Sequence, residues 1–178
     1  MTKELEQIMA NAGFFQAGET TTDQIHFGEE IRTLCENNVC RHYNTTWACP
    51  PATGTVEECK ARCLSYRFAL VFSQKYCLED SFDLEGMLAG QKDFHGIVRK
   101  LSGAIGGVLN DYLLMGSEGC EACDKCTYPD SPCRFPEKMH PSVEAYGIYV
   151  NELTRAAGIN YINGPDTVTY IGALLYNG

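Results

Sequence analysis

Apolar residues recur along the chain at two different spacings, and these separate the expected helices from the expected strands. In residues 81–109 they return every three or four positions, which predicts a long amphipathic helix with one buried face. Residues 67–74 form a compact apolar run and residues 111–115 form another, so both are expected to be core strands. Residues 168–176 predict a further strand.

Shorter segments fill the gaps between these elements. Three further helices are expected, at residues 2–11, 28–36 and 56–64. Thr55 and Glu58 fit a capping box at the start of the last of these helices. Ile25 and Phe27 alternate with polar neighbours, which indicates a weak edge strand.

The segment after the last cysteine reads as a helix followed by two strands. Pro141 suits the first position of a helix, and Gly158 suits its end. A short strand is expected at residues 159–162, with Gly164 and Pro165 in the turn that follows it. Together the elements predict an α+β fold. Residues 1–178 would form a single metal-binding domain, with a small mixed β-sheet flanked by helices and two cysteine-rich loops.

The composition is that of a folded acidic protein. The 178 residues are 44% hydrophobic and 21% charged, which excludes a disordered chain. A net charge of −9 without any basic run argues against nucleic acid or an anionic membrane as a partner. No apolar stretch reaches the roughly 18 residues of a membrane span, and the charged first residues do not resemble a secretory signal. A cytoplasmic, reducing location is expected, whereas the oligomeric state is left open.

Ten cysteines are the unusual feature, and in a reducing compartment they are expected to be ligands rather than disulfides. The strongest pattern is Cys120-x2-Cys123-x2-Cys126-x6-Cys133. Three closely spaced thiolates can converge on one iron–sulfur cluster. The run resembles the bacterial ferredoxin pattern C-x2-C-x2-C-x3-C-P, but its last gap is longer. Cys133 is therefore expected either to complete this cluster or to bind another one.

Zinc is the alternative metal for these cysteines. Structural zinc sites usually contain two separated C-x2-C pairs, whereas a single C-x2-C-x2-C run favours iron and sulfide. The sequence therefore predicts [4Fe-4S] clusters, one or two per chain, with zinc as the second choice.

A looser group of cysteines precedes the first core strand. Its ligands are expected to be Cys35, Cys40 and Cys49, because proline follows the last of these, as it follows a ligating cysteine in ferredoxins. Cys59 is the best fourth ligand. Two other cysteines could replace it and are otherwise expected to be buried free thiols, namely Cys63 and Cys77.

Several residues beside the cysteines are candidates for supporting roles. Trp47 is expected to cover the first loop and limit solvent access to a cluster. Arg41 and Arg134 each follow a cysteine, so they can donate to a cluster sulfur or hold an anionic substrate, unless carboxylates pair with them. His42 is the one histidine close to a ligand in sequence, and Glu144 suits the first turn of its helix.

Two long segments match the pattern of a known family. They are CENNVCRHYNTTWACPPATGTVEEC, residues 35–59, and CEACDKCTYPDSPCRFPEKMHPSVEAYG, residues 120–147. The combination of W-x-C-P-P with C-x2-C-x2-C-x6-C-R-x-P and P-S-x-E-A-x-G resembles the DUF2284 predicted metal-binding proteins of anaerobic bacteria and archaea, over most of the chain. The resemblance implies cysteine-bound metal of the iron–sulfur type and no particular substrate. The implied ligands are Cys35, Cys40, Cys49, Cys59, Cys120, Cys123, Cys126 and Cys133.

Three functions are compatible with these ligands. The first is a small electron carrier to a partner enzyme, and two oxidised clusters would bring its net charge to about −13. The second is an enzyme whose cluster has only three cysteine ligands, which leaves one iron open as a Lewis acid. The third is a structural zinc or iron–sulfur domain. The catalytic residues of an enzyme, if it is one, are not indicated by the sequence.

Overall fold

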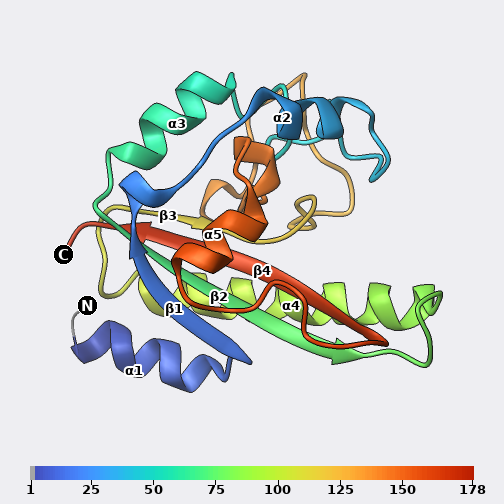
Figure 1. The fold of residues 1–178 in the computed structure, drawn as a ribbon. Helices are drawn as coiled ribbons and strands as arrows, with labels where there is room; N and C mark the ends of the chain where they lie inside the picture. Colours follow the sequence, from blue (N-terminus) through green and yellow to red (C-terminus); the bar gives the residue numbers. More distant parts are fainter. Residues whose placement is uncertain (1–2) are drawn as a thin grey trace.

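Four strands form one sheet in the order β1-β2-β4-β3 (Figure 1). The structure is a computed structural model and describes residues 3–178. The strands are β1 (Gln16–Thr21), β2 (Phe68–Cys77), β3 (Tyr112–Met115) and β4 (Thr167–Tyr176). The helices in the described residues are α1 (Lys3–Ala12), α2 (Glu29–Glu36), α3 (Val56–Leu64), α4 (Leu84–Ile105) and α5 (Val150–Ala156). The expected α+β class is confirmed.

The sheet is antiparallel rather than mixed. β2 and β3 each pair antiparallel with β4, so β2 and β3 run in the same direction. Strands connected through a helix commonly share a direction in this way. β4 lies between them, so the two parallel strands never pair directly. Among the described residues, a parallel pairing occurs at the isolated bridge between Gly116 and Ser142.

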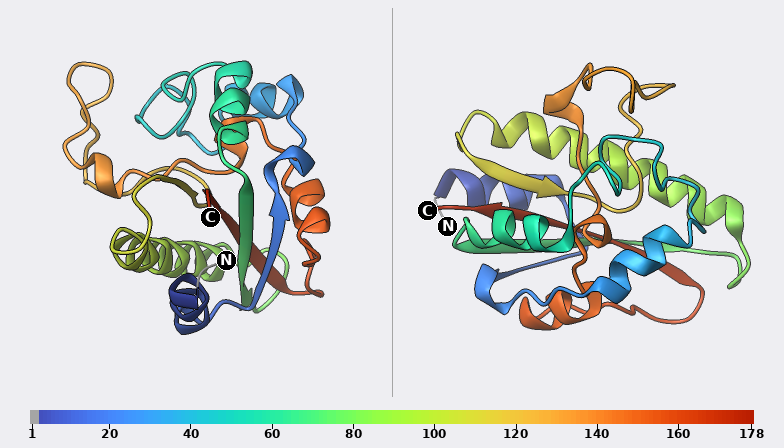
Figure 2. Two further views of the ribbon diagram at one scale, coloured as in Figure 1. Left: turned by 90° about the vertical axis from the view of Figure 1, so that its left-hand side faces the viewer. Right: turned by 90° about the horizontal axis from the view of Figure 1, so that it is seen from above.

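Side chains on the central strands alternate between two buried faces. On β2, Leu70 and Phe72 belong to one apolar cluster, whereas Ala69 and Val71 belong to the other. α1 and α4 cover the first face, and α3 and α5 lie on the second (Figure 2). A strand buried on both faces reads as a continuous apolar run, which is why β2 and β4 could be predicted.

β1 was not expected, because its sequence QAGETT has little apolar character. It pairs along β2 in continuous register from Gln16 opposite Ser73 to Thr21 opposite Phe68. An edge strand of this kind is stabilised by its backbone hydrogen bonds rather than by an apolar face. The strand expected at Ile25 and Phe27 is wrong, since Phe27 makes only an isolated bridge.

The helix expected from Pro141 to residue 157 is broken in two. A 3-10 turn at Glu144–Tyr146 is followed by Gly147 in the left-handed conformation, with φ of 72°, before α5 begins. A side chain at Gly147 would meet Val56 at 3.1 Å, so close packing on α3 requires glycine here. The strand expected at residues 159–162 is also wrong, because that segment is irregular.

The remaining helices confirm the sequence pattern with small changes at their ends. The first helix was expected to begin at residue 2, which lies outside the described residues. The long helix starts later than expected because Asp83 caps it, accepting a hydrogen bond from the Gly86 amide at 2.8 Å. Within residues 3–178, no helix has the length and apolar composition of a membrane span.

The capping box of α3 provides a test of the local structure beside Cys59. The Thr55 hydroxyl accepts a hydrogen bond from the Glu58 amide at 3.2 Å, and the Glu58 carboxylate accepts one from the Thr55 amide at 2.8 Å. Thr55→Ala should therefore reduce the free energy of unfolding by about 1 kcal/mol. Urea denaturation would measure this, with Thr55→Ser as the matched control that keeps the cap. Equal stability of the two variants would contradict the assigned cap.

Candidate metal centre

The two cysteine loops lie together at one end of the molecule, beyond α2 and α3 (Figure 2). We call residues 37–55 the first loop and residues 116–135 the second loop. In the first loop Asn38, Arg41 and Asn44 have positive φ, so its backbone turns tightly between the cysteines. Residues 37–55 contain turns and bends and no helix or strand.

Aromatic side chains join the two loops. The indole nitrogen of Trp47 donates a hydrogen bond to the Ser131 carbonyl at 3.0 Å, and the Tyr128 hydroxyl donates one to Asn44 Oδ1 at 2.9 Å. The Trp47 and Tyr128 rings also contact each other edge to face, with centroids 4.9 Å apart. Trp47 therefore binds one loop to the other, in addition to covering its own loop as expected.

A glycine in the second loop allows a further close contact. A Cβ atom at Gly119 would lie only 2.6 Å from the His42 ring. The imidazole therefore packs against the backbone immediately before Cys120. A side chain at this position would have to displace the His42 imidazole from this contact.

The thiols of the first loop interact with those of the second. Burial raises the pKa of Cys49, and the thiols of Cys40, Cys120 and Cys126 raise it further. Burial likewise raises the pKa of Cys35 to about 11; Arg32 opposes this increase. With raised pKa values the thiols of Cys35, which is half-buried, and Cys49, which is buried, are neutral at pH 7, so a bound metal would have to displace their protons.

Within the second loop, Cys120 occupies the centre of a similar set. Burial raises the pKa of its thiol, the thiols of Cys133 and Cys123 raise it further, and backbone amides of Ala122 and His140 oppose the increase. Across residues 3–178, no three Cys, His, Asp or Glu side chains are close enough to hold a single metal ion. The fold thus brings the sulfurs into one region without arranging them as a one-ion site.

Arg32 was missed by the sequence analysis and is the main electrostatic feature of the first group. Its side chain is only 8% exposed, yet no carboxylate in the described residues forms an ion pair with it. Its guanidinium donates to the carbonyls of Gly54 at 2.7 Å and Ala145 at 3.0 Å, and to the sulfur of Cys59 at 3.9 Å. Its Nε atom is buried without a hydrogen-bond partner.

A buried cation without a carboxylate is costly unless another anion compensates it. Arg32 faces Cys59 and also lowers the pKa of Cys35, so thiolate ligands or an anionic cluster would supply that charge. An all-sulfur donor set beside an uncompensated guanidinium fits an anionic, cysteine-bound cluster. Arg32 lies three positions before Cys35 on a predicted helix, and this spacing was the signal that could have identified it.

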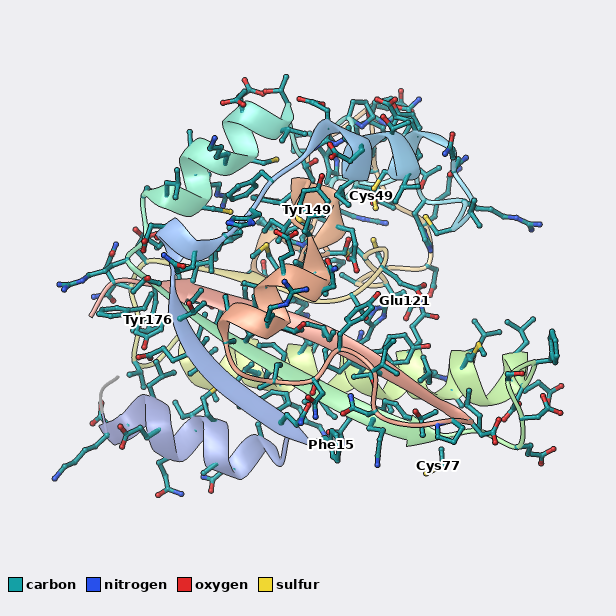
Figure 3. The ribbon with its side chains drawn as sticks, viewed as in Figure 1. Phe15, Cys49, Cys77, Glu121, Tyr149 and Tyr176 are labelled. Carbon is teal, nitrogen blue, oxygen red and sulfur yellow. The ribbon has the colours of Figure 1, made fainter. Side chains whose placement is uncertain are left out.

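The structure separates the three candidates for the fourth ligand. Cys59 and Cys63 are both buried on α3 and both belong to the same apolar cluster, and burial raises the pKa of each thiol, that of Cys63 to about 12. Cys63 is buried as expected, whereas Cys59 is distinguished by its contact with Arg32. Cys77 was expected to be buried as well, but it is exposed at the far end of β2, away from Cys49 (Figure 3). This correction follows from β2 running three residues beyond the predicted strand.

Other candidates have less direct connections to the cysteines. Arg41 is exposed, and Arg134 donates to the Lys125 carbonyl inside the second loop. Neither forms an ion pair in the described residues. Glu144 lies in the 3-10 turn rather than in a helix, and burial raises the pKa of its carboxyl group. Its carbonyl is 4.0 Å from the Cys35 sulfur, so this turn borders the first group.

The family comparison agrees with this arrangement. The DUF2284 model, described as a predicted metal-binding protein, matches residues 19–176, which include both loops and all the strands after β1. The chain belongs to the DUF2284 family. No curated protein and no solved structure matches this DUF2284 protein. The family supports metal binding in general terms and does not identify the metal.

Proposed function

We propose that this DUF2284 protein is a small electron carrier that binds one or two [4Fe-4S] clusters at the end of the molecule formed by its two loops. The observation that carries the proposal is the connected set of thiols. Cys35 interacts with Cys40 and Cys49, and Cys49 interacts with Cys120 and Cys126. Cysteine-bound clusters exchange single electrons without rearranging the protein, which suits a chain of this size.

The assignment of ligands to clusters follows the spacing of the cysteines along the sequence. The second-loop set is Cys120, Cys123, Cys126 and Cys133, and the first set is Cys35, Cys40, Cys49 and Cys59. Cys59 is connected to the first set through Arg32, whose guanidinium lies 3.9 Å from its sulfur. When bound, the clusters would supply reversible one-electron chemistry, while Arg32 would stabilise the negative charge of the first set.

The surface beside the first set suits a basic protein partner. Leu34 and Val39 are 63% and 87% exposed, close in sequence to Cys35 and Cys40. The same helix exposes Glu29 and Glu36. An apolar patch edged by carboxylates would attract a partner with basic residues around its own redox centre, and salt would weaken the encounter.

A second function is favoured by the position of Cys59. Its sulfur donates to the Thr53 carbonyl at 3.3 Å, and the thiol next to it is that of Cys63 rather than one of the first loop. If Cys59 is not a ligand, the first set has three cysteines and one open iron, which would act as a Lewis acid on a substrate.

The test is metal and acid-labile sulfide content on protein purified without oxygen, together with its absorption spectrum. About eight iron and eight sulfide per chain would support two clusters, and about four of each would support one. The reduced protein should then pass electrons to ferric cytochrome c, a basic protein, at a rate that falls as ionic strength rises. Colourless protein with zinc would overturn the proposal and leave a structural site.

Cys59→Ala separates the carrier from the enzyme. Loss of iron from this variant supports four ligands in the first set, and therefore the carrier. Full iron content with an unchanged spectrum supports the open iron. Cys77→Ala is the matched control, because its exposed thiol lies far from Cys49 and should leave the iron content unchanged (Figure 3).

A further inference from the structure

A cleft of about 650 Å³ lies between α3, β3 and the second loop. This volume is within the range of sites for small organic molecules. Cys133 is in its wall, on the side of the metal centre, and Trp47 lines it next to Ser131. Four of the lining residues are prolines, at positions 129, 132, 136 and 141. Because proline restricts the backbone, these walls are stiff, and binding would cost little ordering.

Arg62 and Tyr146, which both line this cleft, are joined by a hydrogen bond. Arg62 Nη1 donates to the Tyr146 hydroxyl at 3.0 Å, which leaves the hydroxyl hydrogen available. The Tyr146 side chain is 2% exposed, and in the described part of the chain no acceptor is bonded to that hydrogen. Burial raises the pKa of Tyr146 to about 12, so the hydroxyl remains a donor at neutral pH.

Arg62 forms no ion pair with a carboxylate within residues 3–178, and it also interacts with the hydroxyl of Tyr66, which donates to Asp111 Oδ1 at 3.0 Å. A guanidinium beside an unused hydroxyl donor presents several N–H and O–H groups to the same space. A carboxylate, with two oxygens and no donors, is complementary to this arrangement. His140, also in the wall, has a buried Nε2 atom without a partner in the described residues, which adds a polar group to the site.

The other residues that line the cleft indicate the shape of the part of the ligand that carries the acid group. Trp47, Tyr112 and the prolines offer flat apolar surfaces that suit an aromatic or similarly planar group. Asp130 and Glu137 also line the cleft and are both exposed. They disfavour a second negative charge on the ligand, so a single carboxylate on a planar organic body is the best match.

We propose that this cleft binds a small aromatic monocarboxylate, with the acid group on Arg62 and Tyr146 and the ring against Trp47. The binding groups belong to the chain itself, so the proposal goes beyond electron transfer and does not depend on which metal is bound. Because Cys133 is in the wall, the bound molecule would lie beside the second set of ligands.

Calorimetric titration of the metal-loaded protein, without oxygen, tests this with three matched probes. They are 3-phenylpropionate, its neutral amide and 2-phenylethylamine. The acid should bind at least about tenfold more tightly than the amide, which corresponds to 1.4 kcal/mol. Arg62→Gln should abolish that tenfold difference, and Tyr146→Phe should reduce it. Arg155→Gln, which removes an exposed arginine on α5, is the control for net charge and should bind as the unmodified protein does.

Equal binding of acid and amide, tighter binding of the amine, or binding of none of the probes would overturn the proposal. Iron content and circular dichroism measured on the same samples show whether Arg62→Gln remains folded and loaded. If that variant unfolds, the ratio of the affinities of the unmodified protein for the acid and the amide still tests the proposal. If the protein contains zinc and still binds the acid, the proposed ligand site stands and the proposed electron-carrier function fails. The failure of one proposal can therefore be distinguished from the failure of the other.

Discussion

Removing the metal should lower the midpoint of thermal unfolding by at least about 10 °C. Both loops are long, irregular segments held by few regular hydrogen bonds, and burial raises the pKa of the Cys49 and Cys120 thiols within them. Metal binding to such cysteines becomes part of the folding free energy, which reaches roughly 10–16 kcal/mol for structural zinc peptides. Even a quarter of that value would change the melting temperature of a protein of this size by about 5–16 °C.

The comparison is between protein as purified without oxygen and the same protein after chelation under reducing conditions, each followed by circular dichroism. The apoprotein should also aggregate in air, because free thiols at the exposed end of the molecule can form intermolecular disulfides. Reloading with iron and sulfide is the control and should restore the midpoint. An apoprotein that melts together with the loaded protein would contradict a cluster that supports the fold.

Replacing Arg32 with methionine should remove iron from the first set and weaken the fold. The substitution leaves the Gly54 carbonyl without its 2.7 Å donor and deprives the Ala145 carbonyl of its 3.0 Å donor. Lost partners of this kind cost about 1–3 kcal/mol each, so unfolding of the apoprotein should require about 2–6 kcal/mol less. The positive charge beside Cys35 and Cys59 would disappear as well.

Arg41→Met is the matched control. It removes the same charge from an exposed position close to Cys40, which the sequence alone made the stronger candidate. Iron per chain and urea denaturation of the apoprotein measure the two effects separately. If Arg32→Met keeps all of its iron, or if Arg41→Met loses as much, the role assigned to Arg32 is wrong.

The elements that could be predicted are those in which one local pattern determines the structure. β2 and β4 are buried on both faces, and the Thr55 capping box fixes the start of α3. β1 could not be predicted in the same way, because its partner is fifty residues away and its own side chains are mostly polar. The break at Gly147 depends on contact with Val56, which only the folded chain reveals.

The candidate site shows the same limit. Cysteine spacing grouped the ligands, and the family match over residues 19–176 supports metal binding. Spacing could not show that Cys49 interacts with Cys120 and Cys126 across the two loops, or that Trp47 joins them. Nor could it distinguish Arg32 from Arg41, since burial rather than sequence distance to a cysteine decides which arginine faces the sulfurs.

The position of β4 at the centre of the sheet has a consequence for biosynthesis. This strand follows both cysteine loops along the chain, yet it is the element that joins β2 to β3. While the ribosome is still synthesising residues before Thr167, the two halves of the sheet have no strand between them. The two loops would therefore leave the ribosome before the sheet can close around β4, so the loops would have to wait for translation of this strand before reaching their final arrangement.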